Sequence, residues 1–131
     1  MVELTLPYPP SANSYWRHPT SGRGAGKHLI SEEGRTYRRL VDDAVEQLRY
    51  EGLLSRHPLS TRLSVFLTVS APDNRRRDLD NLPKALFDAL THSGVWNDDS
   101  QIDEIRILRI ASGQSKVRVV ITDMAQVRKA A

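Results

Sequence analysis

The sequence predicts an α/β fold of the α+β kind, with two main helices on one face of a mixed four-stranded sheet. Residues 37–48 repeat apolar side chains at spacings of three and four, which is typical of an amphipathic helix. Apolar residues at every second position of 63–70 instead indicate a strand. The elements follow in the order strand, helix, strand, helix, strand, strand, and two packed layers are the economical way to bury them.

Length and composition indicate a single domain over residues 1–131, with 123–131 as a helical or frayed tail. Hydrophobic residues make up 39% and charged residues 27%, which is ordinary for a soluble protein and argues against global disorder. No apolar run has the length of a membrane span, and the N-terminus lacks the pattern of a signal peptide. Because there is no cysteine, disulfides and thiolate metal sites are excluded. We therefore expect a cytoplasmic protein without a membrane partner.

The first half of the chain is expected to contain a strand, a loop and the long helix. Residues 2–6 alternate as a short strand, and the prolines that follow end it. The polar and aromatic segment 11–18 is compatible with a further short strand. Residues 19–27 are rich in glycine and indicate a loop or hairpin tip. Ser31 is a suitable N-cap for the long helix, and Gly52 is a suitable stop.

The second half is expected to contain a helix and two strands after the strand at 63–70. The helix begins near Asp80 and ends at Gly94. Residues 102–110 carry apolar side chains on both faces, which favours a central strand. Residues 112–115 suit a hairpin turn before the last strand, 117–121.

Gly26 and Lys27 superficially suggest a loop that binds nucleotide phosphates. That motif needs a glycine five positions before Gly26 and a Ser or Thr after the lysine. Ser21 and His28 occupy these positions, so no nucleotide cofactor is expected. The loop is then either a solvated segment or a flexible basic element that touches nucleic acid.

The stretch from residue 75 to residue 84 concentrates charge of both signs. Its charged side chains are Arg75, Arg76, Arg77, Asp78, Asp80 and Lys84. In an extended segment, carboxylates two residues apart face the same volume, and a lysine four residues further on a helix lies one turn along. Asp99 comes from the turn after this helix. It can join the other carboxylates only if the next strand pairs beside 63–70.

Clustered carboxylates and cations have two interpretations. Three carboxylates suit Mg²⁺, which could polarise a phosphodiester and activate water while Lys84 stabilises the developing charge. In the alternative, Asp80 is a helix cap paired with Lys84, Asp78 pairs with Arg76 or Arg77, and residues 98–99 form an ordinary turn. Spacing alone leaves both open.

Several short motifs together are similar to one known family. They are Leu6-Pro7-Tyr8-Pro9-Pro10-Ser11 with Asn13 and Arg17, Ser31 with Gly34 and Tyr37-Arg38, Arg77-Asp78-Leu79-Asp80-Asn81-Leu82 with Lys84, Phe87-Asp88-Ala89-Leu90, and Trp96-Asn97-Asp98-Asp99 with Gln101. The chain resembles the RusA family of Holliday-junction resolvases of bacteria and phages, from about residue 4 to the last strand. The resemblance implies a Mg²⁺-dependent endonuclease of DNA recombination and repair that cuts four-way junction DNA as a homodimer.

The resemblance also implies roles for individual residues. Asp78, Asp80 and Asp99 match the metal-binding acidic positions, and Lys84 matches the catalytic lysine. The expected DNA contacts are Arg75, Arg76, Arg77, Arg17 and Asn81. Shape rather than base readout is expected to select the junction.

Aromatic residues add two expectations. Tyr15 or Trp16 either stacks on an opened base or packs within the protein. A two-fold dimer would present identical sites to the two strands of a junction, and Phe66 is one candidate for its interface.

Two other functions stay open. The chain could be a module that binds DNA junctions without cutting them, against which the acidic residues and Lys84 argue. It could also be a related metal nuclease that acts on flaps or RNA.

Overall fold

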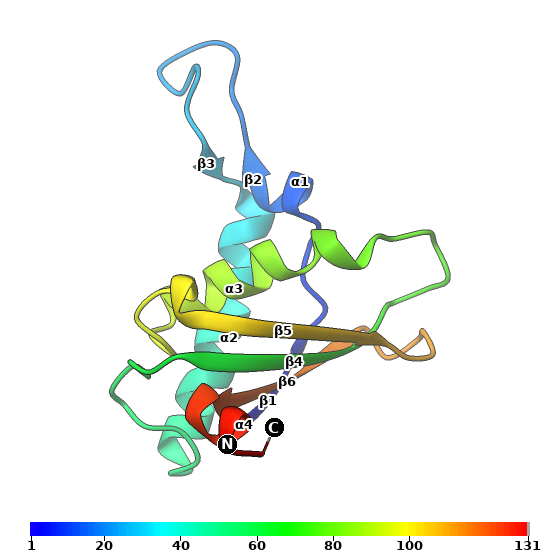
Figure 1. Ribbon diagram of the computed structural model, residues 1–131. Helices are drawn as coiled ribbons and strands as arrows, with labels where there is room; N and C mark the ends of the chain where they lie inside the picture. Colours follow the sequence, from blue (N-terminus) through cyan, green and yellow to red (C-terminus); the bar gives the residue numbers. More distant parts are fainter. Residues whose placement is uncertain (131) are drawn as a thin grey trace.

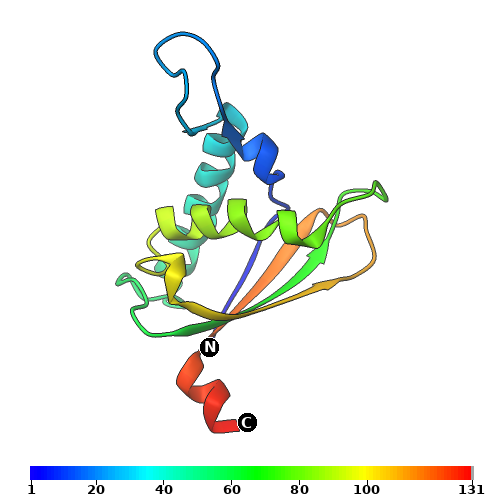
Figure 2. The same cartoon turned by 45° about the horizontal axis from the view of Figure 1, so that its top comes forward.

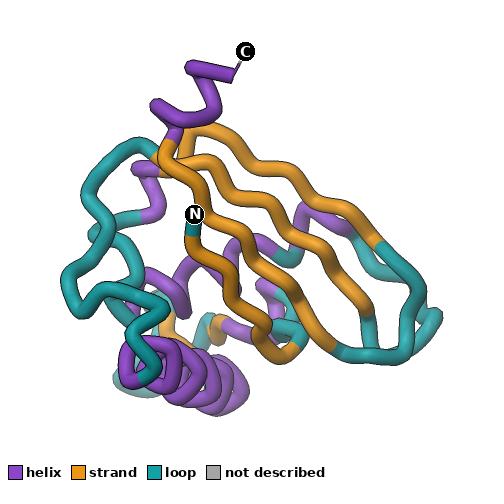
Figure 3. The backbone as a smooth tube through the Cα atoms, turned by 90° about the horizontal axis from the view of Figure 1, so that it is seen from below, coloured by secondary structure: helices purple, strands orange, loops and turns teal. Residues whose placement is uncertain are grey.

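The structure is a computed structural model that describes residues 1–130. A mixed four-stranded sheet has the order β1-β6-β4-β5, and helices α2 and α3 cover one of its faces (Figures 1 and 3). The α+β prediction is therefore confirmed. The strands are β1 (Val2–Pro7), β4 (Leu63–Ser70), β5 (Ile102–Arg109) and β6 (Lys116–Asp123), with a separate ribbon of β2 (Trp16–Arg17) and β3 (Leu29–Ile30). The helices are α1 (Ala12–Tyr15), α2 (Glu32–Tyr50), α3 (Pro83–His92) and α4 (Met124–Ala130), with 3₁₀ turns η1 (Leu79–Asn81) and η2 (Asp99–Gln101).

The core lies between the sheet and the two long helices. Helix α2 buries Tyr37, Val41 and Val45 of its predicted apolar stripe, whereas Leu40 of the same stripe is 43% exposed. Strand β4 buries Val65 and Leu67 on the same side. Burial of such side chains typically stabilises a fold by about 1.5–3 kcal/mol each.

Two parts of the molecule, the β2–β3 ribbon and helix α4, project away from the sheet (Figure 2). The ribbon β2–β3 carries the loop 19–27 outward at one side, and α4 projects at the other (Figure 2). Residues 124–130 of the expected tail are thus helical, and residue 131 lies outside the described residues. Among residues 1–130, no helix combines the length and apolarity that crossing a bilayer requires.

Strand β5 is an edge strand, so the prediction of a central strand at 102–110 was wrong. It pairs only with β4, in parallel. Its apolar side chains remain partly uncovered, with Ile105 48% and Leu108 52% exposed. Apolar residues on both faces show what a strand can bury, whereas the topology of the sheet decides which neighbours it has.

The segment 112–115 does not make a hairpin between β5 and β6. Strand β6 pairs with β1 and β4, so the connection passes the end of β4. The Ser70 hydroxyl holds it by donating to the Ala111 carbonyl oxygen at 2.7 Å and accepting from the Gln114 N–H at 3.1 Å. Turn residues predict a local reversal of the chain, and they do not determine which strand comes next in the sheet.

Gly34 lets α2 dock closely against the ribbon and α1. The Ser31 hydroxyl accepts from the Gly34 N–H at 2.9 Å, and the Ser31 N–H donates to the Tyr15 carbonyl oxygen at 2.9 Å. A Cβ atom on Gly34 would lie 2.4 Å from that same carbonyl oxygen and 2.7 Å from Ile30 Cγ1. No side chain fits there without moving backbone, which explains the Ser-x-x-Gly pattern.

We expect Gly34→Ala to destabilise the protein by about 1–3 kcal/mol, because the added methyl group overpacks this contact. Urea-induced unfolding of the purified variant measures the change. Thr36→Ala, two residues along the same helix and exposed, is the matched control and should leave the stability nearly unchanged. Equal stability of Gly34→Ala and the wild type would contradict this account of the packing.

Candidate active site

The basic stretch belongs to an arm that follows β4. Residues 71–78 extend beyond the sheet and return to the start of α3 (Figure 1). Arg77 holds the arm in shape, since its guanidinium contacts the Asp73 carboxylate at 2.8 Å. The Arg77 carbonyl oxygen accepts from Arg109 at 2.6 Å, and its guanidinium lies 5.8 Å from the centre of the Tyr8 ring. The Arg77 hydrogen bond, and then the Arg75 N–H, lower the pKa of Asp73 below its usual value.

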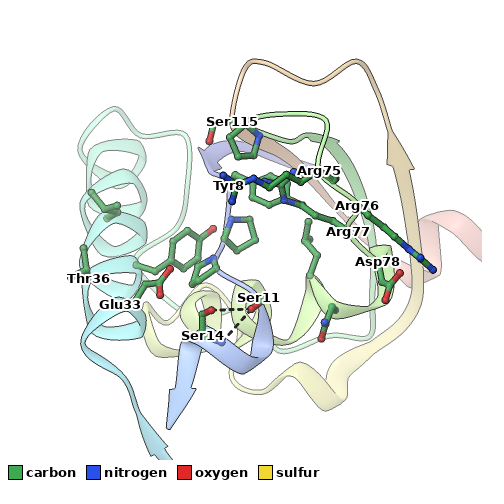
Figure 4. Close-up of a pocket in the computed structure, with 17 residues that line it drawn as sticks. Tyr8, Ser11, Ser14, Glu33, Thr36, Arg75, Arg76, Arg77, Asp78 and Ser115 are labelled. Carbon is green, nitrogen blue, oxygen red and sulfur yellow. Dashed lines mark hydrogen bonds between the residues drawn. The ribbon is translucent and has the colours of Figure 1, made fainter.

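Arg75 and Arg76 differ from Arg77 because both are exposed. Arg75 reaches the Asp73 carboxylate only at 3.6 Å, and no ion pair is formed by Arg76 within residues 1–130. Arg75, Arg76, Arg77 and Asp78 of the arm line a groove of about 710 Å³ together with Asn81 (Figure 4). Two arginines of the arm are thus available to an anionic partner.

Asp78, Asp80 and Lys84 occupy the entry to α3, and all three are exposed. Asp78 is extended, with φ −90° and ψ 133°, whereas Asp80 lies in the 3₁₀ turn η1 and Lys84 in the first turn of α3. The helix therefore begins at Pro83, after a separate turn, rather than near Asp80. Its N-cap position is Leu82.

None of the side chains of Asp78, Asp80 and Lys84 has a hydrogen-bond or ion-pair partner in the part of the chain that the structure describes. The structural alternative, in which Asp80 pairs with Lys84 and Asp78 with a neighbouring arginine, is thus not what the structure shows. Arg77 binds Asp73 instead. The carboxylates are free to accept a cation.

Asp99 projects from a turn that two buried side chains anchor. Trp96 is 1% exposed, and its Nε1 donates to Thr91 Oγ1 at 2.6 Å. Gln101 Nε2 donates to the carbonyl oxygens of Leu59 and Thr61, each at 2.9 Å. These contacts explain why a tryptophan and a glutamine flank the acidic pair.

Asp98 and Asp99 have different roles in this turn. Asp98 caps η2, because its carboxylate accepts from the Ser100 N–H at 3.2 Å and its own N–H donates to Gln101 Oε1 at 2.8 Å. Hydrogen bonds from Ser100 lower the pKa of Asp98. Asp99 is exposed, and its side chain makes no such bond within residues 1–130.

One protomer does not gather the three predicted metal ligands. The pairing that would bring Asp99 beside 63–70 exists, since β5 lies next to β4. However, the pairing is parallel, with Leu63 opposite Ile102, so Asp99 lies near the start of β4 and the arm follows its end. Residues 1–130 contain no group of three acidic or histidine side chains placed to hold a metal ion. The assignment of Asp78, Asp80 and Asp99 to one metal site therefore stays a prediction.

An ion-pair cluster that the sequence analysis did not identify joins three helices. Arg38 on α2 contacts the Asp88 carboxylate on α3 through Nη2 at 2.7 Å and Nε at 3.0 Å. The Tyr15 hydroxyl, on α1, bonds to both side chains. Burial, and then the Asp88 hydrogen bond, raise the pKa of the Tyr15 phenol. Both Arg38 and Asp88 lie in family motifs, which was the available signal, but residues 50 positions apart cannot be paired by spacing.

The remaining candidates lie on the ribbon or in the core. Tyr15 is fully buried and bonded to Arg38 and Asp88, so it packs within the protein and does not stack on a base. Trp16 is partly buried and stacks on His28, with ring centres 4.3 Å apart. Arg17 is exposed on β2, away from the arm (Figure 1). The predicted DNA contacts therefore form two separate groups.

The fold and site can be compared with known proteins. A family of DNA-cutting enzymes, described as Endodeoxyribonuclease RusA, matches residues 7–122. This chain belongs to that family and is thus an endodeoxyribonuclease, a hydrolase of phosphodiester bonds. A relative named crossover junction endodeoxyribonuclease rusA, from Enterobacteria phage HK97, is 36% identical over 95% of this chain and 97% of its own length. Proteins of the same name from Enterobacteria phage 82 and Escherichia coli K12 are 38% identical over 92% of this chain and 93% of theirs.

We expect Gln101→Leu to destabilise the protein by about 1–3 kcal/mol, because the Thr61 carbonyl oxygen and the Asp98 N–H lose their partner and the Leu59 carbonyl oxygen loses one of its two donors. Chemical unfolding measures this loss. Asn97→Ala, in the same turn and exposed, is the control and should cost much less. If both variants lost equal stability, the anchoring role of Gln101 would be wrong.

Proposed function

We propose that this endonuclease cuts four-way DNA junctions as a homodimer that uses Mg²⁺, and so resolves intermediates of DNA recombination and repair in the cytoplasm. The names of relatives that match over more than nine tenths of the chain support this substrate. The observation that carries the proposal is the pair of exposed, unpaired carboxylates, Asp78 and Asp80, beside an arginine-rich arm. Carboxylates that stay free next to phosphate-binding cations suit a metal nuclease better than a module that only binds DNA.

The chemistry of these donors fits Mg²⁺, which takes one or two carboxylates together with waters and phosphate oxygens. Asp78 and Asp80 would hold the ion from the arm side, and Asp99 is the third ligand of the proposal. When bound, Mg²⁺ supplies a polarised phosphodiester and a water of lowered pKa.

A second protomer would complete the site. Because Asp99 and the arm lie at opposite ends of the parallel pair β4–β5, one chain presents Asp78 and Asp80 in one place and Asp99 in another. We infer that the two-fold dimer places Asp99 of one protomer beside Asp78 and Asp80 of its partner. A two-fold arrangement produces two such composite sites, as paired cleavage of two symmetry-related strands requires.

The basic side chains would have two roles, phosphate binding and stabilisation of the transition state. Arg75 and Arg76 would neutralise phosphates and supply binding energy that falls with salt. Lys84 lies in the first turn of α3, after the carboxylates, and would stabilise the charge that develops on the scissile phosphate. Phosphate contacts carry no sequence information, so the junction would be selected by the path of its strands.

We expect Asp80→Asn to bind a synthetic four-way junction with nearly wild-type affinity and not to cut it in Mg²⁺. The substitution keeps the shape of the side chain but removes the charge that holds the ion. Cleavage is measured on denaturing gels and binding by gel shift in chelator. Asp43→Asn, which removes an exposed carboxylate on α2 away from the arm, is the control that should still cut.

Wild-type protein that binds the junction without nicking it in any divalent ion would support the non-cutting module instead. If linear duplex or flap DNA is cut as fast as the four-way junction, the chain would instead be a related metal nuclease with a different substrate.

A mixture of two inactive variants tests whether the site is composite. Asp80→Asn and Asp99→Asn are co-expressed with different tags, and the heterodimer is purified through both tags. If the partner supplies Asp99, one of the two sites in this heterodimer is intact, and nicking of a single strand returns. If each site is built within one protomer, both sites stay defective and the heterodimer does not nick.

Lys84→Ala should slow single-turnover cleavage by about 100-fold, as for other groups that stabilise developing charge. Junction affinity should change little, because one of many phosphate contacts is lost. Lys116→Ala, an exposed lysine on β6, is the control. Equal losses in rate and affinity would make Lys84 a phosphate contact only.

A further inference from the structure

A groove runs from the arm to helix α2, and the proposed function uses only its arm side, through Arg75, Arg76 and Asp78. Its floor is apolar, with Tyr8 half-buried and Pro9 and Tyr37 buried. The Tyr37 hydroxyl donates to the Pro7 carbonyl oxygen at 2.8 Å, so this ring is fixed in place. The volume of about 710 Å³ lies within the usual range of ligand sites.

The two walls of the groove differ in charge. Arg75 and Arg76 lie on the arm side, where Arg75 reaches toward Tyr8 and the Arg76 side chain extends past Asp78, away from Glu33 (Figure 4). Glu33 and Leu40 of α2 form the opposite wall. Leu40 is 43% exposed, so its side chain offers apolar surface to the groove. The groove therefore offers cations on one side, a carboxylate on the other, and an apolar floor between them.

These features match the chemistry of a single nucleotide. A phosphate would be attracted to the arginines and repelled by Glu33, which orients the sugar–phosphate toward the arm. The flat base would then lie against Leu40 and beside the Tyr8 ring, one face of which Arg77 covers. Apolar and aromatic surfaces of this kind bind bases without regard to sequence. A base stacked within a duplex cannot enter a groove, so the occupant must be an unstacked nucleotide.

We propose that this groove is a subsite for one unstacked nucleotide of the DNA substrate, next to the phosphate that is cut. The inference rests on the proposed function, because an open branch point supplies unstacked nucleotides and intact duplex does not. It adds a binding site to the metal and arginine contacts, with Tyr8 and Leu40 as the residues that contact the base.

The test compares two single-stranded probes of equal charge, in chelator so that neither is cut. One is a thymidine octamer, and the other is an octamer of the same backbone without bases. Wild-type protein should bind the thymidine octamer about tenfold more tightly, which is the value of stacking one base. Fluorescence anisotropy measures both affinities. The ratio isolates the contribution of the bases, because charge affects both probes alike.

Leu40→Glu should reduce this ratio to nearly one, because it blocks the base-binding wall. Leu53→Glu is the matched control, since Leu53 is 65% exposed and lies outside the groove, and its ratio should stay at the wild-type value. Unfolding midpoints check that both variants fold. A wild-type ratio of one, or a ratio unchanged in Leu40→Glu, would overturn the subsite.

Junction cleavage in Mg²⁺ is measured on the same preparations and distinguishes the two proposals. Cutting by the wild type with a ratio of one leaves the proposed function standing and removes the subsite. If the wild type prefers the thymidine octamer, Leu40→Glu loses that preference and the wild type never cuts the junction, the groove remains a nucleotide site. The proposed function would then be wrong.

Discussion

The parallel pairing of β4 with β5 is the constraint on which the arrangement of the acidic residues depends. Two parallel neighbours need a crossover, and here the arm, η1 and α3 supply it. A crossover starts at the end of one strand and finishes at the beginning of the next. The carboxylates before α3 and the carboxylate after it are therefore separated by the length of that helix. The same rule that builds the sheet prevents a single protomer from closing the predicted metal site.

Two sets of polar contacts hold the crossover in place. The Arg38–Asp88 pair, with the Tyr15 hydroxyl, fixes the middle of α3 against α2 and α1. Gln101 fixes the turn after α3 through backbone carbonyl oxygens of the preceding loop. Breaking one member of a partly buried ion pair leaves the other unsatisfied, so such contacts are specific as well as stabilising. The exposed carboxylates are thereby presented from rigid supports, as a catalytic group requires.

The arm shows how one run of arginines can divide into different roles. Arg77 forms an ion pair with Asp73 and packs over Tyr8, and its carbonyl oxygen accepts a hydrogen bond from Arg109. These contacts stabilise the arm itself. Arg75 and Arg76 are exposed and line the groove. A charge that is already neutralised by a neighbour attracts phosphate less than a free one. Binding of DNA by this segment would therefore depend more on Arg75 and Arg76 than on Arg77.

Local patterns in the sequence determined the elements, since the apolar periods of α2 and β4 identify them without any tertiary information. The acidic, lysine and arginine positions of the candidate site also followed from the sequence, through spacing and the family motifs. Only the tertiary structure decided that β5 is an edge strand, that Arg38 pairs with Asp88, and that Asp99 lies away from Asp80 in one protomer. The physical reason is that periodicity records which side of an element is apolar, whereas strand order and crossover direction depend on contacts between residues far apart in the chain.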